Sequence, residues 1–325
     1  MKARTGIRSA LRKAFAAAAA AAVILGCGGA AAETVRIGTL PASDSILLIA
    51  ASEDGLFAKE GLDIALVPFR SAMEIGAAMR AGELAGHYGD IMNVLTQNAS
   101  GAPQKIVATM TTAGGGQRNF ALLVSPAAAE RIPTLDALKA KRGVETAMSS
   151  STIIDYLLTR LEETAGVPGE VLKRAEIRQI PIRLQMLLAG KMDTALLPEP
   201  LATVVEQKGG RALWDDRALS EPLAVVAFRN EKLNPDFVKH FRAALLEAEK
   251  RIESDPEKYR AMMVEKRLLP PPAAKAYAMP RYSEKAGPDG LLPLPAEADI
   301  RRVGDWMVGK GMLKAVPAAS EVVER

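Results

Sequence analysis

Cysteine, histidine and aromatic residues are scarce in this chain of 325 residues, and each shortage makes a class of site improbable on chemical grounds. The one cysteine, Cys27, leaves no partner for an intramolecular disulfide. With His87 and His240 as the only imidazoles, a metal centre of nitrogen and sulfur ligands is not expected. Aromatic residues make up 4% of the chain, which disfavours a stacking cage around a large planar ligand. We therefore predict no metal and no cofactor.

The first 32 residues have the pattern of an export signal. Five basic and no acidic side chains precede Glu33, and the apolar stretch 14–26 is short for a membrane span. Two cleavage sites compete. Residues 24–27 resemble a lipobox, which would give a leader of residues 1–26 and a lipid on Cys27, whereas residues 30–32 suit ordinary signal peptidase. In either case we expect a periplasmic protein, and a tether through Cys27 is the favoured form.

The basic excess of the chain belongs to this leader. The chain has 42 basic and 38 acidic side chains, and removing the five in the leader leaves 37 against 38. No run of lysine and arginine interleaved with aromatic residues remains, so a nucleic-acid partner is not expected.

The rest of the chain alternates strands with helices, which predicts an α/β fold. Strands are expected at 35–40, 62–69, 87–90, 105–110, 120–124, 144–148, 177–181 and 194–198. The glycine-rich segment 111–116 lies between two of them and predicts a hinge crossover, with a flexible surface loop as the alternative. The chain is expected to return within 222–228. The predicted lobes are therefore 33–113 with 225–325, and 114–224.

Polar residues stand at the N-termini of two predicted helices. Ser71 and Glu74 have the spacing of a capping box after the strand 62–69. Ser149–Thr152 precede a strongly amphipathic helix that ends at Gly166. Four hydroxyl side chains beside free amides favour binding of an acidic group there, and simple helix capping is the alternative.

The order of these blocks resembles the solute-binding proteins that serve ABC importers, in particular the group for nitrate, sulfonates, taurine and thiamine pyrimidine precursors. The blocks are 52–69, Ser71–Glu74, His87–Asp90 and 194–200, the last resembling a strand that ends in a Glu-Pro pair at the cleft mouth. The resemblance implies a two-lobed type II periplasmic binding protein fold, with the ligand cleft between lobes joined by two hinge crossovers. It also implies a monomer that delivers a small molecule to an inner-membrane permease with a cytoplasmic ATPase.

The candidate ligand-binding residues follow the predicted strands. Arg70 could pair with an oxyanion, whereas Asp44 and Glu199 favour an amine or a heterocyclic N–H. A small organic anion or zwitterion is the favoured ligand, and a thiamine-type aminopyrimidine is the alternative. The full set is Ser43, Asp44, Ser45, Arg70, Ser71, Asp90, Thr111, Thr112, Ser149, Ser150, Ser151, Thr152, Arg183 and Glu199.

Catalytic motifs are missing from the sequence. It has no G-x-S-x-G, no Walker loop and no H-E-x-x-H. Asp44, Asp90 and Glu199 are an acid/base set only if they converge. The pyrimidine synthases of similar fold depend on cysteine- and histidine-rich motifs that are absent here. LysR-type regulators of similar fold need an N-terminal helix-turn-helix, where this chain has its leader. We therefore expect a binding protein and no enzyme.

Overall fold

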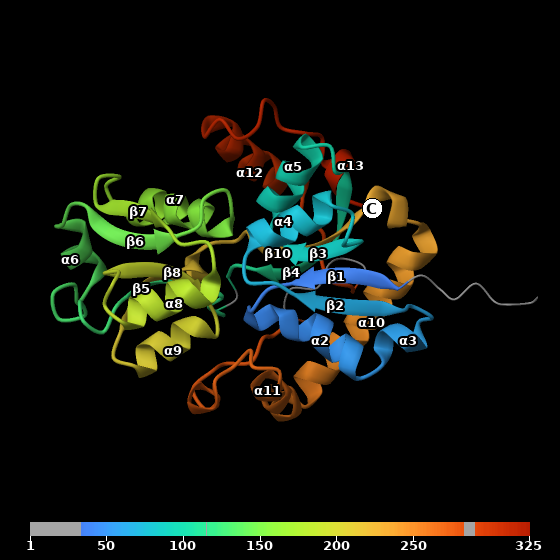
Figure 1. Ribbon diagram of the computed structural model, residues 1–325, viewed down its shortest axis with the longest axis horizontal. Coiled ribbons are helices and arrows are strands. Elements are labelled where there is room, and N and C mark those ends of the chain that lie inside the picture. The colour runs from blue at the N-terminus through green and yellow to red at the C-terminus, as the bar shows by residue number, and fades with distance from the viewer. Residues whose placement is uncertain (1–33, 115, 283–289) are drawn as a thin grey trace, which may run out of the picture. The chain divides into compact units, whose positions relative to one another are not determined.

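The computed structural model describes residues 34–114, 116–282 and 290–325. The predicted leader, its two cleavage sites and Cys27 lie outside these ranges. The described chain forms two five-stranded sheets, which Figure 1 shows with helices on both faces of each. Among the described helices, none combines the length and the apolar character that crossing a membrane requires.

The first sheet has the order β2-β1-β3-β10-β4, in which β10 is antiparallel to β3 and β4. Alternate residues of β10 face opposite sides: Val226 and Phe228 pack with α2 and α10, whereas Val225 and Ala227 pack with α5. The strands are β1 (Val35–Thr39), β2 (Ile64–Pro68), β3 (Gly86–Gly89), β4 (Gln104–Thr112) and β10 (Pro222–Arg229). The helices are α2 (Ile46–Glu53), α3 (Leu56–Lys59), α4 (Ala72–Arg80), α5 (Ile91–Ala99), α10 (Pro235–Ser254) and α11 (Pro256–Glu265).

The second sheet has the order β7-β6-β8-β5-β9 and is built from the middle of the chain. Leu122 and Val124 of β5 face the α7 side, and Ala121 and Leu123 face α8 and α9. The strands are β5 (Phe120–Val124), β6 (Val144–Met148), β7 (Leu172–Glu176), β8 (Thr194–Pro198) and β9 (Arg211–Asp215). The helices are α6 (Leu135–Lys139), α7 (Ile153–Ala165), α8 (Ile180–Leu188) and α9 (Leu201–Gln207).

The chain passes between the sheets twice. The first passage, 113–119, leads from β4 to β5, as the glycine-rich segment predicts. The second, 216–221, leads from β9 to β10 and so lies just before the predicted 222–228, which is the strand β10 itself. The Ala113 amide donates to the carbonyl of Glu221 over 2.8 Å, which ties the two passages together. The exact limits of the two lobes stay a prediction.

One predicted strand is wrong. Residues 177–181, expected as a strand, are the turn before α8 and the first two residues of that helix, and the edge strand β7 lies five residues earlier at Leu172–Glu176. β7 carries three charged residues among five and so lacks an apolar run, as suits an edge strand that pairs only with β6. Pro181 stands in the first turn of α8, where its missing amide costs no hydrogen bond.

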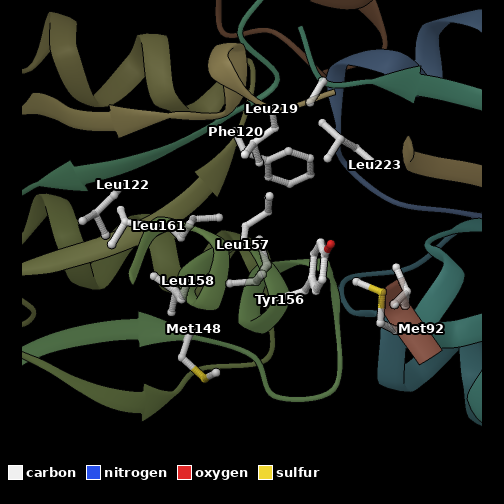
Figure 2. Close-up of a cluster of buried hydrophobic side chains, with 14 of the residues drawn as sticks. Met92, Phe120, Leu122, Met148, Tyr156, Leu157, Leu158, Leu161, Leu219 and Leu223 are labelled. Atoms are coloured by element: carbon white, nitrogen blue, oxygen red, sulfur yellow. The ribbon is translucent and has the colours of Figure 1, made fainter. Parts of the chain in front are cut away.

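The helix α12 (Glu297–Gly309), near the C-terminus, packs against helices of both lobes. Ile300, Val303 and Met307 join the cluster that contains Met92 of α5 and Leu157 of α7. Figure 2 shows this cluster running from Leu122 and Phe120 of β5 in the second sheet to Met92 of α5, a helix that covers the first sheet. The Trp306 ring stands edge-on to Tyr156 with 5.4 Å between centroids, and its Nε1 donates to Thr159 Oγ1 over 3.2 Å. The short helix α13 (Ala319–Val322) follows.

We predict that Gly86→Ala lowers the free energy of unfolding by about 1–3 kcal/mol, because overpacking a buried site forces its neighbours to move. A Cβ on Gly86 would lie 2.4 Å from Cδ1 of Phe228 and 2.8 Å from the carbonyl oxygen of Ala227. Urea denaturation followed by circular dichroism measures the change. Gly169→Ala is the matched control, since a Cβ there meets nothing within 4 Å. Equal stability of the two variants would contradict the prediction.

Candidate functional site

A cavity with walls from both sheets lies where strand ends meet helix N-termini. Its volume is about 50 Å³. Most of its lining is apolar, and a few polar groups converge on it, the usual composition of a small-molecule site. The lining is Leu40, Ala42, Ala72, Tyr88, Gly89, Asp90, Phe120, Ser149, Thr152, Ile153, Ile154, Arg178, Ile180, Arg183, Pro198, Leu223 and Ala224.

Asp90 joins the N-termini of two helices from different lobes. Its Oδ1 accepts from the Asn93 amide over 2.7 Å and caps α5, while its Oδ2 accepts from the Ile153 amide over 2.8 Å at the start of α7. The side chain is 4% exposed, and burial raises its pKa to about 6, against the lowering effect of these two hydrogen bonds. The carboxylate of Asp90 therefore already accepts the hydrogen bond of one backbone amide, that of Ile153, at the predicted anion site.

The hydroxyl residues before α7 are bonded mainly to their own segment. Thr152 caps the helix by accepting from the Ile154 amide over 3.2 Å, and its hydroxyl donates to the Ser149 carbonyl over 2.8 Å. The Ser150 amide donates to Glu176 over 3.0 Å, and Ser151 has a left-handed φ of 59°. Of the four, Ser149 and Thr152 line the cavity.

Arg183 is a fully buried cation in the cavity wall. All of its hydrogen bonds go to neutral carbonyl oxygens. Nε and one Nη donate to the carbonyl oxygen of Ile177 over 3.2 and 3.0 Å, and the other Nη donates to the carbonyl oxygen of Leu196 over 3.3 Å. Burial lowers its pKa to about 10. Within the described residues no carboxylate forms an ion pair with this guanidinium, so its charge is solvated only by peptide dipoles.

Asp44 lies in a separate polar cluster within the first lobe. The Tyr88 hydroxyl donates to its Oδ1 over 2.7 Å and the Thr111 hydroxyl donates to its Oδ2. Burial raises its pKa, and these hydrogen bonds oppose the rise. Together with Ser43, Thr111 and Thr112 it lines a second, smaller space of about 20 Å³. The Ser45 hydroxyl donates to the Leu40 carbonyl over 2.8 Å.

Glu199 is bound within the second lobe. Its Oε1 accepts from Nε of Arg118 over 2.7 Å, and its Oε2 accepts from the amide and hydroxyl of Thr203 at 3.2 and 2.9 Å. Arg118 also pairs with Glu206 through two hydrogen bonds of 3.0 and 2.6 Å. Glu199 and Arg118 line an open groove and are absent from the lining of the cavity that contains Asp90. Asp44, Asp90 and Glu199 therefore do not line one common space, as an acid/base set would require.

Arg70 and Ser71 lie at the contact between α4 and α8. Ser71 caps α4 by accepting from the Glu74 amide over 3.2 Å, and Glu74 accepts from the Arg70 amide over 3.0 Å. The Arg70 carbonyl accepts from the Ile180 amide over 3.1 Å, and Gln179 donates to Glu74 over 3.1 Å. These two bonds cross between the lobes. The Arg70 side chain is exposed and does not line the cavity.

The sequence analysis missed the apolar walls. Phe120 and Pro198 come together because β5 and β8 pair in antiparallel register at their ends, and Leu223 follows the second passage between the sheets. Neither pairing has a local sequence signal. Tyr88 is the second aromatic residue that lines the cavity, whereas Phe69 and Tyr156 do not line it. Within the described ranges, no group of histidine, cysteine, aspartate and glutamate has an arrangement that would hold a metal ion.

Solved structures with this architecture define its class as the two-lobed type II periplasmic binding protein fold. The alkanesulfonate-binding protein SsuA from Xanthomonas axonopodis pv. citri bound to MOPS has a TM-score of 0.73 and 18% identity, covering 90% of this chain and 98% of that one. The aliphatic sulphonate binding protein SsuA from Escherichia coli has a TM-score of 0.69 and 18% identity, covering 90% and 97%. The zinc-bound ligand-binding component of an ABC-type import system from Staphylococcus aureus has a TM-score of 0.71 and 15% identity, covering 90% and 96%.

The chain belongs to the NMT1-like family, whose model matches residues 28–265. No curated protein sequence matches the chain. The membership agrees with the resemblance to the group of solute-binding proteins for nitrate and sulfonates, which rests on blocks inside the matched range.

We predict a specific pH signature for Asp90→Asn. Because the pKa of folded Asp90 is raised to about 6 from 3.8, the folded protein keeps a proton that the unfolded chain has already released. This stabilisation is complete below pH ~4 and is lost as the pH rises through about 6. The unfolding free energy of the wild type minus that of the variant should therefore fall by up to ~3 kcal/mol between pH 4 and 8. Urea titrations at five pH values measure it.

Asp54→Asn is the control with the opposite sign. Burial raises the pKa of Asp54, but hydrogen bonds from Tyr259 and Lys258 outweigh it, and the net pKa is lowered. The unfolding free energy of the wild type minus that of Asp54→Asn should therefore rise with pH, since the stabilisation that a lowered pKa gives is lost as the pH falls. A difference for Asp90→Asn that is flat or rises with pH would refute the prediction.

Proposed function

We propose that this protein is the exported substrate-binding component of an ABC-type importer, which captures a small solute between its lobes and delivers it to a membrane permease. The observation that supports this most directly is the cavity, because its walls come from both lobes and the lobes are connected by two short passages. Closure about such passages is the usual way in which two-lobed proteins enclose a ligand.

The ligand we propose is a small organic anion or zwitterion. Arg183 supports an acidic group, because a buried guanidinium without a carboxylate partner gains ~1.5–3 kcal/mol from each charge-assisted hydrogen bond. One of the structures of similar fold is an alkanesulfonate-binding protein bound to MOPS, and another is the nitrate-binding protein NrtA from Synechocystis PCC 6803, with 17% identity and a TM-score of 0.61. A second candidate is an aminopyrimidine. The buried carboxylate of Asp90 favours it, because the N–H groups of an aminopyrimidine can donate hydrogen bonds to that carboxylate.

We propose Asp90, Ser149, Thr152 and Arg183 as the direct ligand contacts, since they alone among the predicted residues line the cavity. The other predicted residues are proposed as support. Asp44 and Thr111 position Tyr88, and Glu199 with Arg118 fixes the end of β8. Catalysis is not part of the proposal, because Asp44, Asp90 and Glu199 are each hydrogen-bonded in separate clusters.

A thermal-shift screen tests the ligand class. We expect a rise in Tm with members of the set taurine, alkanesulfonates, nitrate and small carboxylates, because a ligand that binds only the folded state stabilises it by mass action. Arg183→Gln should abolish the rise, and Arg131→Gln, an exposed arginine of the second lobe paired with Asp193, should not. The ligand recovered afterwards should have an unchanged mass, which separates binding from turnover. Stabilisation by aminopyrimidines alone would refute the anion class.

We propose further that the mature protein is anchored by lipid on Cys27, a residue that lies outside the described ranges. Intact-mass analysis of protein from the membrane fraction should find a diacylglyceryl group on an N-terminal Cys27. Cys27→Ala should move the protein to the soluble periplasmic fraction. A native N-terminus at Glu33 would show the ordinary signal-peptidase route and contradict the proposal.

A further inference from the structure

Two ionisable side chains of opposite charge line the cavity, and each is at least nine-tenths buried. Asp90 is 4% exposed and Arg183 is 0% exposed. Their hydrogen bonds go to backbone groups and not to each other: Asp90 accepts from the amides of Asn93 and Ile153, and Arg183 donates to carbonyl oxygens. The cavity therefore has a negatively charged group on one wall and a positively charged group on another, and each group has its own backbone hydrogen-bond partners.

The position of Asp90 changes what the start of α7 can bind. An acidic ligand group placed at this helix terminus would need the Ile153 amide, and Asp90 Oδ2 already accepts from it over 2.8 Å. The neighbouring amides of Ser150 and Ile154 are bonded to Glu176 and Thr152. A ligand with acceptors only, such as nitrate or an alkanesulfonate, would meet a carboxylate there and no free donor from these groups.

Asp90 can still accept hydrogen bonds from a ligand. Each of its oxygens receives one amide hydrogen and has a second lone pair, since a carboxylate offers about four acceptor sites. A ligand ammonium or other N–H group would gain a charge-assisted hydrogen bond there. Arg178 also lines the cavity, but its Nε donates to Glu176 over 2.8 Å, so its charge is neutralised locally.

Building on the proposed function, we infer that Asp90 is the specificity-determining residue of the cavity: it selects ligands with a protonated nitrogen and disfavours ligands that have only acceptors. The acidic end of the same ligand then faces Arg183 rather than the start of α7. The ligand class is accordingly a short zwitterion with an amino group and a sulfonate or carboxylate group.

Matched ligand pairs test this assignment by isothermal titration calorimetry at pH 7.5. The pairs are taurine with ethanesulfonate and 3-aminopropanoate with propanoate, and the members of each pair differ only by the amino group. We expect the wild type to bind the amino member of at least one pair tenfold or more tighter. Asp90→Asn should reduce this preference to about threefold or less, because a neutral amide does not attract the ammonium group.

Asp155→Asn is the matched control. It removes the same charge from another buried carboxylate at the start of α7, which is bonded to the Ser151 amide at 3.4 Å and does not line the cavity. It should leave the preference intact, and circular dichroism melts confirm that both variants fold. Equal affinity of the wild type for the two members of both pairs, or an Asp90→Asn variant that keeps a tenfold preference, overturns the role of Asp90 and leaves the proposed function intact. Failure to bind any ligand of the thermal-shift set overturns the proposed function with it.

Discussion

The carboxylate of Asp216 holds the two passages between the sheets in one position, and the cavity depends on that position. Its Oδ1 accepts from the amides of Asn119 and Phe120 at 2.8 and 2.9 Å, and its Oδ2 accepts from the Asn119 side chain at 2.9 Å. The side chain is fully buried, and burial raises its pKa. A residue of the second passage thereby fixes the first passage at the point where Phe120 enters the cavity wall.

Glu221, at the other end of the second passage, extends the same connection into α7. It accepts from the Tyr156 hydroxyl and pairs with Arg160 at 2.9 Å, while its carbonyl accepts from the Ala113 amide. Gly114 allows the close approach, because a Cβ there would lie 2.9 Å from the Leu219 carbonyl oxygen and its φ is 102°. The passages are thus short, hydrogen-bonded to each other and anchored in the second lobe.

The sequence predicted the features that depend on local pattern. Ser71 and Thr152 cap α4 and α7, as their positions before these helices indicate, and Asn234 and Asp255 cap α10 and α11 by the same chemistry. The two-lobed fold could also be predicted from the sequence, because its strands and helices alternate in the order of a known family. The strand predicted at 177–181 failed because its apolar residues begin an amphipathic helix, while the real edge strand is mostly polar.

The candidate site was less predictable, because its chemistry depends on long-range pairing. Asp90 has the signature of a helix cap, and it does cap α5, but only the tertiary structure reveals its second bond to Ile153, 63 residues later in the chain. Nothing in the sequence separates Glu199 from Asp90 as a ligand-binding candidate, but in the structure its two carboxylate oxygens accept hydrogen bonds from Arg118 and Thr203. Residue type and position at a strand end therefore predicted a set of candidate ligand-binding residues. The hydrogen-bond partners that each side chain finds in the folded protein determine which of these residues line the cavity.

The placement of α12 gives the protein an optical property. This helix packs on α5 of one lobe and on α7 of the other, and Trp306 makes its contacts with Tyr156 and Thr159 of α7. Separation of the lobes would move α12 relative to α5 or to α7, and a movement relative to α7 would change the surroundings of the Trp306 indole. Trp214, in β9, is the only other tryptophan. In a Trp214→Phe background, the emission maximum of Trp306 alone would report, without an added dye, whether α12 stays on α7 when the lobes open and close.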